Sequence, residues 1–366
     1  MTLTKIQLKP GIQKQTSDLG ASGGFTDCDN TRFRYGLPEK IGGWTKTTDS
    51  TLIGVVRDAH HWVSLDGTRL AALGTDKKLY IYANDILYDI TPARQTNSSV
   101  SNIFTTANGT PNVTVNITGH GASVGDIVTF SGTTGLSGTS FTAANFDRSF
   151  EVKSVTSTNA FVIQQDANET TGTVTTGTAT AVFDISIAPP SSTFGYGWGT
   201  STWNTETWNT PRSSSSVTLD GRDWSIDNFG ELMIATVLDG STFQWSPTND
   251  GLTGKASAVT NAPTASKFSL VSTPDRHLIL FGTEKTVGSG GSQDPLLLRF
   301  SSQEDINTYQ PTAENTAGSL RIQDGSTIVG ADKARGQILV WTDTSLHALQ
   351  FIGPPFTFGL NQLGRN

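Results

Sequence analysis

Residues 59–92 constrain the fold of this chain most strongly, because short apolar runs alternate there with turn signals. The runs are HHWVSL, RLAALGT, KLYIYA and ILYDI, and they predict four short strands. Asp66-Gly67-Thr68 joins the first two, and Asp-Gly between apolar runs signals a hairpin because Gly tolerates the positive φ of tight turns. Four such strands make a unit the size of one propeller blade. A lone sheet of this size cannot bury both faces, so we expect similar units beside it.

Three similar units follow further along the chain, at residues 220–247, 267–311 and 326–351. In each unit one apolar run ends near a Thr, and the four such residues are Thr75, Thr236, Thr283 and Thr342. The last two intervals are 47 and 59 residues, near the length of propeller repeats. We therefore predict an all-β protein with a β-propeller-like core of short antiparallel meanders. The alternative is that any protein rich in meanders shows some periodicity.

Composition supports the all-β class and limits the function. Only 16% of residues are charged, Gly numbers 38, and no window keeps a 3.6-residue apolar period. No apolar run approaches the ~20 residues of a membrane helix, so no membrane-spanning segment is expected. The first residues lack the apolar core of a signal peptide, and Cys28 is alone, which favours a reducing cytoplasm. The net charge of −7 argues against tight nonspecific DNA binding, but not against DNA passing nearby.

Differences in composition and apolar periodicity along the chain predict three regions. Residues 1–24 are polar and Gly-rich and are expected to form an N-terminal arm. Residues 96–185 show period-two alternation, for example NVTVNITG, and predict a small inserted β domain. Residues 25–95 plus 186–366 are then the propeller-like core. GPPFTFGLNQLGRN offers no obvious strand that would close a ring of blades. Either this core is incomplete and the chain is part of a longer protein, or the ring closes by another route.

The segment TRFRYG predicts an interaction patch. Arg32 and Arg34 alternate with Phe33 and Tyr35, so a strand there would put the guanidinium groups on one face and the rings on the other. Arg and aromatic residues are favoured in interface cores. The alternative is local pairing of the two Arg side chains over a packed strand, and the candidate partners are Asp27, Asp29 and Glu39.

Tryptophans recur in the tract FGYGWGTSTWNTETWNT. Trp198, Trp203 and Trp208 are five residues apart, a spacing that fits neither a helix nor one face of a strand. Each Trp buries ~150–250 Å², so the three must pack on their own domain or on a neighbouring chain. We predict that they form subunit or adaptor contacts together with Arg32, Arg34, Tyr35 and Trp44. The alternative is that they are stacking platforms of a glycan- or receptor-binding module.

No motif for catalysis or cofactor binding survives inspection. His60 and His61 are neighbours on a predicted strand, so their rings point to opposite faces and cannot easily chelate one ion. The sequence contains no nucleophile elbow, and its single Cys has no paired His. We therefore expect no catalytic residue, no metal and no cofactor, and predict that the protein is not an enzyme. A hydrolase on a propeller scaffold is the third hypothesis.

Three stretches resemble the tail nozzle, or tail tubular protein B (tail hub), family of short-tailed bacteriophages. They are KPGIQKQTSDLGASGGFTDCDNTRFRYGLPEKIGGW with the strands that follow it, VTVNITGHGASVGDIVTFSG, and GYGWGTSTWNTETWNTPRS with RDWSIDNFGELMIAT. The resemblance implies a structural virion protein, made in the host cytoplasm, with a propeller core. It also implies six copies in a ring below the portal and its tail adaptor, around a central channel through which the genomic DNA passes without specific binding.

Overall fold

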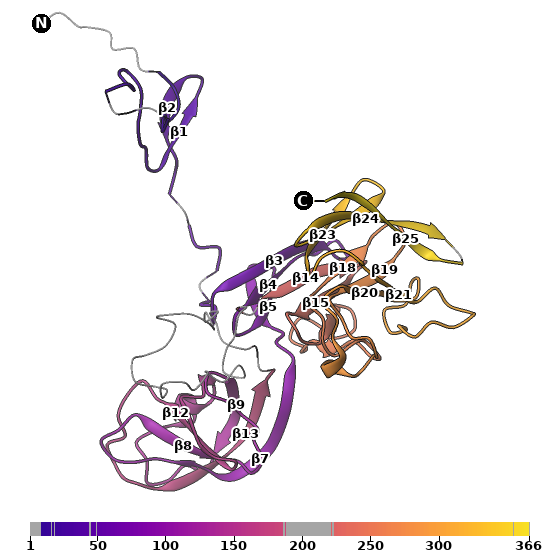
Figure 1. Cartoon of the computed structure of the whole chain (residues 1–366). Coiled ribbons are helices and arrows are strands. Elements are labelled where there is room, and N and C mark those ends of the chain that lie inside the picture. Colours follow the sequence, from indigo (N-terminus) through magenta and orange to yellow (C-terminus); the bar gives the residue numbers. More distant parts are fainter. Residues whose placement is uncertain are drawn as a thin grey trace, which may run out of the picture. The chain divides into compact units, whose positions relative to one another are not determined.

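The computed structural model describes residues 9–15, 17, 19–43, 45–48, 50–185, 187, 221, 223–353 and 355–365 (Figure 1). The chain divides into two compact units, Met1–Asp49 and Ser50–Asn366. The first unit contains a hairpin of β1 (Thr31–Arg34) and β2 (Leu37–Lys40). Residues 25–49 were predicted to belong to the core, but they fall in the first unit because β1 and β2 pair only with each other.

Four four-stranded antiparallel sheets form the propeller-like core, and we call them blades 1 to 4. Each sheet is ordered as in the sequence, so each is a simple meander. Blade 1 contains β3 (Val56–Val63), β4 (Arg69–Thr75), β5 (Leu79–Ala83) and β6 (Ile86–Asp89); blade 2 contains β14 (Trp224–Phe229), β15 (Leu232–Val237), β16 (Thr242–Trp245) and β17 (Ser257–Ala258); blade 3 contains β18 (Phe268–Ser272), β19 (His277–Phe281), β20 (Leu297–Phe300) and β21 (Gly318–Arg321); blade 4 contains β22 (Ile328–Ala334), β23 (Gln337–Thr342), β24 (Ser345–Gly353) and β25 (Thr357–Arg365).

The recurrent Thr has a local structural role in the blades. The Oγ1 of Thr75 accepts the backbone N–H of Lys78 at 2.7 Å, and the Oγ1 of Thr342 accepts that of Ser345 at 2.9 Å. In both blades this hydrogen bond closes the turn between the second and third strands, where a backbone donor would otherwise be unpaired. The predicted all-β fold with blade-like meanders is confirmed.

Neighbouring blades share hydrophobic clusters. Blades 1 and 2 pack through a cluster that includes Trp62 and Trp245. Blades 2 and 3 share a cluster around Ile234 and Leu280. Blades 3 and 4 share another cluster, which contains Phe281 and six other buried residues of blade 3. Within the described part of the chain no cluster joins blade 4 to blade 1. Packing therefore links the blades into an open series.

The predicted small β domain is inserted between β6 and β14. Its seven strands form one sheet in the order β10-β9-β13-β7-β8-β12-β11. Its core consists of its own residues and is rich in Phe, including Phe104, Phe130 and Phe161. Its strands begin three residues before the predicted range of 96–185. The elements are β7 (Ala93–Thr105), β8 (Asn112–Asn116), β9 (Ile127–Thr134), α1 (Ala143–Phe146), β10 (Ser149–Glu151), β11 (Ser154–Ser157), β12 (Ala160–Gln164) and β13 (Thr175–Asp184).

Beyond these strands, the described residues contain α1 and one short 3₁₀ turn, η2 (Gly290–Ser292). Neither has the length or the apolar character needed to cross a bilayer.

Candidate functional site

The first strands of the four blades surround the axis of the propeller. Strands β3, β14, β18 and β22 adjoin in that order. All four contribute to a cavity of about 710 Å³. Its charged lining residues are Arg57, Asp58, Asp223 and Lys267. The cavity therefore presents both signs of charge at a place where all four blades meet.

Carboxylates on these inner strands bind the backbone of the next blade. An inner strand pairs on one side only, so some of its N–H groups point away from its own sheet and need another acceptor. The Oδ2 of Asp58 accepts the N–H of Ile226 at 2.8 Å, which joins blade 1 to blade 2. The Oδ2 of Asp227 accepts the N–H of Val271 at 2.8 Å, which joins blade 2 to blade 3. These two Asp side chains thus fix the spacing of consecutive blades.

Asp227 is the residue at which all four blades converge. Lys333 of blade 4 places its Nζ 2.7 Å from Oδ2 and 2.9 Å from Oδ1 of Asp227. His60 of blade 1 lies with its Nε2 3.9 Å from Oδ1 of Asp227 and 2.8 Å from Oδ1 of Asn228. Only 10% of the Asp227 side chain is exposed. Side chains therefore occupy this part of the axis and link blade 2 to blade 4 across it.

The environment of Asp58 disfavours its charged form. Burial raises the pKa of its carboxyl above the ordinary value, and the negative charge of Asp223 adds to this. Hydrogen bonds from the N–H groups of Ile226 and Ala59 act in the opposite direction. On the other side of the cavity the Nζ of Lys267 contacts Oγ1 of Thr327 at 2.9 Å. The charged residues that line this cavity can hold a polar group by noncovalent contacts. Among the described residues no group of three or more His, Cys, Asp or Glu side chains could hold a metal ion.

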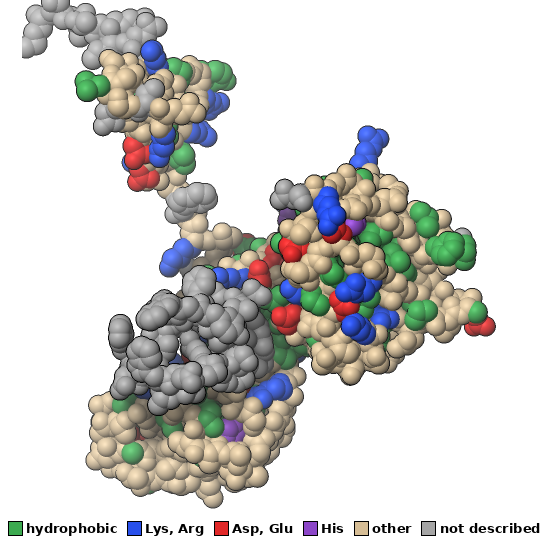
Figure 2. All heavy atoms as spheres, viewed as in Figure 1, with side chains coloured by type: hydrophobic (Ala, Val, Ile, Leu, Met, Phe, Trp, Pro, Cys, Tyr) green, Lys and Arg blue, Asp and Glu red, His purple; other side chains and the backbone are tan. Residues whose placement is uncertain are grey.

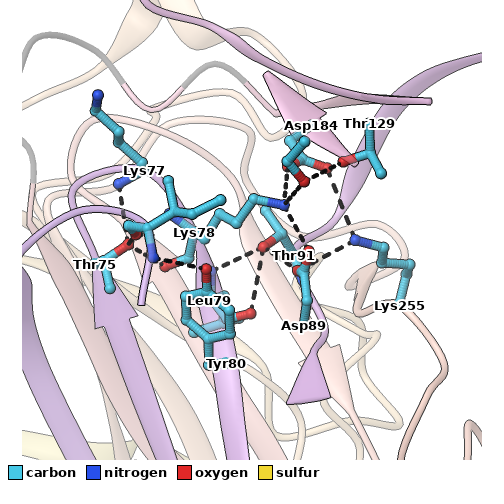
Figure 3. A network of polar contacts seen from close by, with 12 residues as sticks. Thr75, Lys77, Lys78, Leu79, Tyr80, Asp89, Thr91, Thr129, Asp184 and Lys255 are labelled. Atoms are coloured by element: carbon cyan, nitrogen blue, oxygen red, sulfur yellow. Dashed lines mark hydrogen bonds and ion pairs between the residues drawn. The ribbon is translucent and has the colours of Figure 1, made fainter. Parts of the chain in front are cut away.

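A second polar cluster joins the inserted domain to blades 1 and 2 (Figure 3). The side chain of Lys78 in blade 1 is only 1% exposed, and its Nζ lies 2.6 Å from Asp89 and 3.0 Å from Asp184, the last residue of β13. Lys255, in the loop after β16, places its Nζ 3.2 Å from Asp89 and 3.8 Å from Asp184. Two cations and two carboxylates therefore form a charge-balanced cluster at the base of the inserted domain. We call these four residues the Lys78 cluster.

The charges in the Lys78 cluster support one another. Burial opposes ionisation of Asp89, but Lys78 and Lys255 outweigh it and lower the pKa of this carboxyl to about 2. Burial likewise opposes the charge of Lys78, and Asp184 and Asp89 nevertheless raise the pKa of its ammonium above the ordinary value. Burial raises the pKa of Asp184, the most enclosed of the carboxyls. Such a cluster depends on all its members, because a lost partner leaves a buried charge uncompensated.

Arg32, Arg34 and Tyr35 lie in the first unit, in and beside the hairpin of β1 and β2. Arg32 pairs with Glu39, with 3.1 Å between Nε and Oε2, which is the local pairing considered as an alternative. The guanidinium of Arg34 lies 5.4 Å from the ring centre of Tyr35, and Tyr35 is 92% exposed. Their role in an interface stays a prediction. Trp44, Trp198, Trp203 and Trp208 lie outside the described residues.

The described environments of His60, His61 and His277 indicate packing and surface roles. His60 lies beside the axis, whereas His61 is exposed on the other face of β3. His277 is fully buried among Phe300, Phe351 and Phe358, and burial lowers its pKa to about 4. The sequence did not point to Asp58, Asp227 or Lys78. Their common signal is a charged residue within or beside an apolar run, which marks a buried polar contact.

Comparison with known proteins gives little further information. No family model matches the chain, and no curated protein matches it. Among solved structures the chain is similar to the phage phi92 endosialidase, with 14% sequence identity and a TM-score of 0.24. The similarity covers 86% of this chain and 44% of that one, so the chain spans less than half of the endosialidase.

Proposed function

We propose that this protein is a structural component of a bacteriophage tail. In this proposal several copies assemble into a ring, a nozzle or hub below the portal and the tail adaptor, around a channel for the genome. The protein contributes shape and contacts and makes or breaks no bonds. It would be made in the host cytoplasm and reside in the virion.

The observation that carries the proposal is the resemblance of three stretches to the tail nozzle family. One of them, VTVNITGHGASVGDIVTFSG, supplies β8 and β9 of the inserted domain. Another, RDWSIDNFGELMIAT, supplies β14 and β15, including Asp227. The resemblance therefore involves both the inserted domain and the blades. The number of six copies depends on this resemblance alone.

The geometry of the axis suggests where a channel would lie. Asp227, Lys333 and His60 occupy the axis of the four blades. The major groove of duplex DNA alone is about 12 Å wide, so a duplex is far wider than such a set of side-chain contacts. A genome channel would therefore lie between copies and not inside one propeller. This arrangement requires a ring of subunits.

The charge of the chain supports passage of DNA and not its retention. The net charge is −7, and tight nonspecific binding depends on Lys and Arg that neutralise phosphates. Figure 2 shows few Lys and Arg side chains on the visible surface of the inserted domain. A wall of this kind does not hold a moving polyanion.

Mass photometry tests the proposal directly. The chain is measured alone and with the tail adaptor protein of the same phage, at several concentrations. We expect closed oligomers of one defined size, and more of them with the adaptor. Strict monomers under both conditions would count decisively against a ring. An assay of DNA retention at about 0.15 M salt should show no binding, and tight binding would contradict a conducting wall.

A further inference from the structure

Blades 1 and 4 share an irregularity at the axial cavity. The register of β3 with β4 skips Arg57, and the register of β22 with β23 skips Val329, so each inner strand has a bulge there. Both skipped residues line the cavity of about 710 Å³. Blades 2 and 3 pair their first two strands without such a shift. Bulges redirect side chains and interrupt pairing, and they are frequent beside functional sites.

The residue after the bulge carries a carboxylate in blade 1 but is a glycine in blade 4. Asp58 and Gly330 occupy equivalent positions, because each pairs with the residue that precedes the recurrent Thr of its blade. Asp58 accepts the N–H of Ala59 on Oδ1 and that of Ile226 on Oδ2, both at 2.8 Å. Gly330 also lines the cavity, and a Cβ placed on it would meet nothing within 4 Å. Blade 4 therefore has open space where blade 1 has a carboxylate.

The backbone N–H that follows Gly330 needs an acceptor. N–H groups alternate between the two edges of a strand. In β22 the N–H of Lys333 donates to Oδ1 of Asp332 at 2.7 Å, away from β23, and the register is regular from Ala331 to Lys333. The N–H of Ala331 therefore also points away from β23, and Ala331 lines the cavity. Among the described residues it has no acceptor on that side. The equivalent N–H in blade 1 is one that Asp58 binds.

Lys267 brings a positive charge to the side of the cavity formed by blades 3 and 4. It directly precedes β18 and is half-buried, and its Nζ contacts Oγ1 of Thr327 at 2.9 Å. It forms no ion pair with a carboxylate of the described part of the chain. The acids that line the cavity belong to the other two blades, where Asp58 binds two N–H groups and Asp223 binds that of Trp224. A half-buried ammonium in this position favours an anion beside it.

We propose that the axial cavity binds a small polar molecule through a carboxylate group. The carboxylate takes in blade 4 the place that the side chain of Asp58 takes in blade 1, so it accepts the N–H of Ala331 and pairs with Lys267. Hydroxyl groups at the other end of the molecule donate to Asp58 and Asp223. The cavity volume lies in the range of small-molecule sites. This site goes beyond the proposed tail function and does not depend on a ring of subunits.

A carboxylate supplied by the protein itself tests the position of the site. Gly330→Asp places this group beside the N–H of Ala331, and Gly330→Ala is the matched control. The φ of Gly330 is not positive, so both side chains fit the backbone without strain. Without any ligand, Gly330→Asp should melt at a higher temperature than Gly330→Ala, because its carboxylate binds the N–H of Ala331 and faces Lys267. An equal or lower melting temperature would overturn the proposed position.

Titration with gluconate, which has one carboxylate and several hydroxyl groups, tests the binding itself. The signal is the backbone amide resonance of Ala331 in a ¹⁵N-labelled sample. Wild type and Gly330→Ala should bind equally, whereas Gly330→Asp and Lys267→Met should bind about 10-fold more weakly or less. Circular dichroism confirms that each variant is folded.

Two further probes separate the contribution of the carboxylate. Sorbitol has the hydroxyl groups of gluconate without the carboxylate and should leave the resonance of Ala331 unchanged. A shift with sorbitol equal to that with gluconate, or tighter binding of inorganic phosphate than of gluconate, would overturn the assignment of a carboxylate. Gluconate that leaves this resonance unchanged, or binds Lys267→Met as well as wild type, would overturn the site.

Discussion

The inserted domain and the blades bury their aromatic residues in opposite ways. In the inserted domain Phe104 stacks on Phe146 with 3.8 Å between ring centres, and both belong to the same sheet and its short helix. In the blades the tryptophans reach across sheets, as when Trp224 of blade 2 donates its Nε1–H to the carbonyl of Thr75 in blade 1 at 2.7 Å. The inserted domain is therefore complete by itself. A blade, by contrast, depends on its neighbour.

Truncation of one buried aromatic in each region tests this difference most strongly. Phe104→Ala and Trp245→Ala both remove a fully buried ring, and each should cost about 3–5 kcal/mol. Hydrogen exchange should show that Phe104→Ala loosens β7 to β13 only. Trp245→Ala should loosen blades 1 and 2 together, because their cluster is shared. Equal loosening of the inserted domain and the blades by both variants would contradict the comparison.

The Lys78 cluster joins the inserted domain to the blades. Its disruption should reduce the stability of the fold nearly as much as the loss of a buried aromatic ring. Lys78→Met leaves the buried carboxylate of Asp184 and the half-buried carboxylate of Asp89 with Lys255 alone, and the expected loss of stability in urea unfolding is about 3–5 kcal/mol. Lys77→Met is the matched control. It removes a contact of 2.5 Å to Glu151, whose side chain is 52% exposed, so the expected loss is at most about 1 kcal/mol. Similar losses for the two variants would refute a specific role of the buried cluster.

The contact between blades 3 and 4 should depend on pH through His277. Its pKa in the folded protein is about 4, below the ordinary histidine value of 6.5, so the unfolded chain binds a proton first as the pH falls. Stability should therefore decrease from pH 6.5 toward pH 4, by about 2 kcal/mol at pH 5. His277→Phe keeps an aromatic ring among Phe300 and Phe358 and should flatten this part of the profile. An unchanged pH profile of unfolding in this variant would show that another group is responsible.

Loss of the ion pair between Asp227 and Lys333 at the axis should reduce the stability of the fold least. Asp227→Asn preserves the size of the side chain and an acceptor for the N–H of Val271, but it removes the charge that faces Lys333. The expected loss is about 1–2 kcal/mol. Lys333→Met should cost about as much, and the double variant little more, because both remove the same ion pair. Additive losses in a double-mutant cycle would mean that the two side chains act independently.

The sequence alone predicted the blades better than it predicted the contacts between them. Apolar runs and Asp-Gly turns are local signals, so the strands of blade 1 and the three later units could be recognised. The last strands of blades 2, 3 and 4 were missed. The strand β17 has two residues, β21 is the weakly apolar segment GSLR, and β25 lies beyond residue 351, where the predicted fourth unit ends. The hairpin of β1 and β2 follows the predicted arm, and a two-stranded hairpin looks the same in sequence whether or not it joins a larger sheet.

The polar contacts could not be predicted because they join residues far apart in the chain. Asp58 and Ile226 are 168 positions apart, and Lys78 and Ser149 are 71 positions apart. One sequence contains no information on such pairs beyond an unexpected charge beside an apolar run. The local pairing of Arg32 with Glu39, by contrast, was among the alternatives, because both partners lie within one hairpin.

Electron microscopy of the assembled protein with the tail adaptor tests the central claim most directly. We expect a ring of identical subunits around an open channel. A particle that contains this chain as an isolated monomer, or in a position away from any axis of symmetry, would contradict the account.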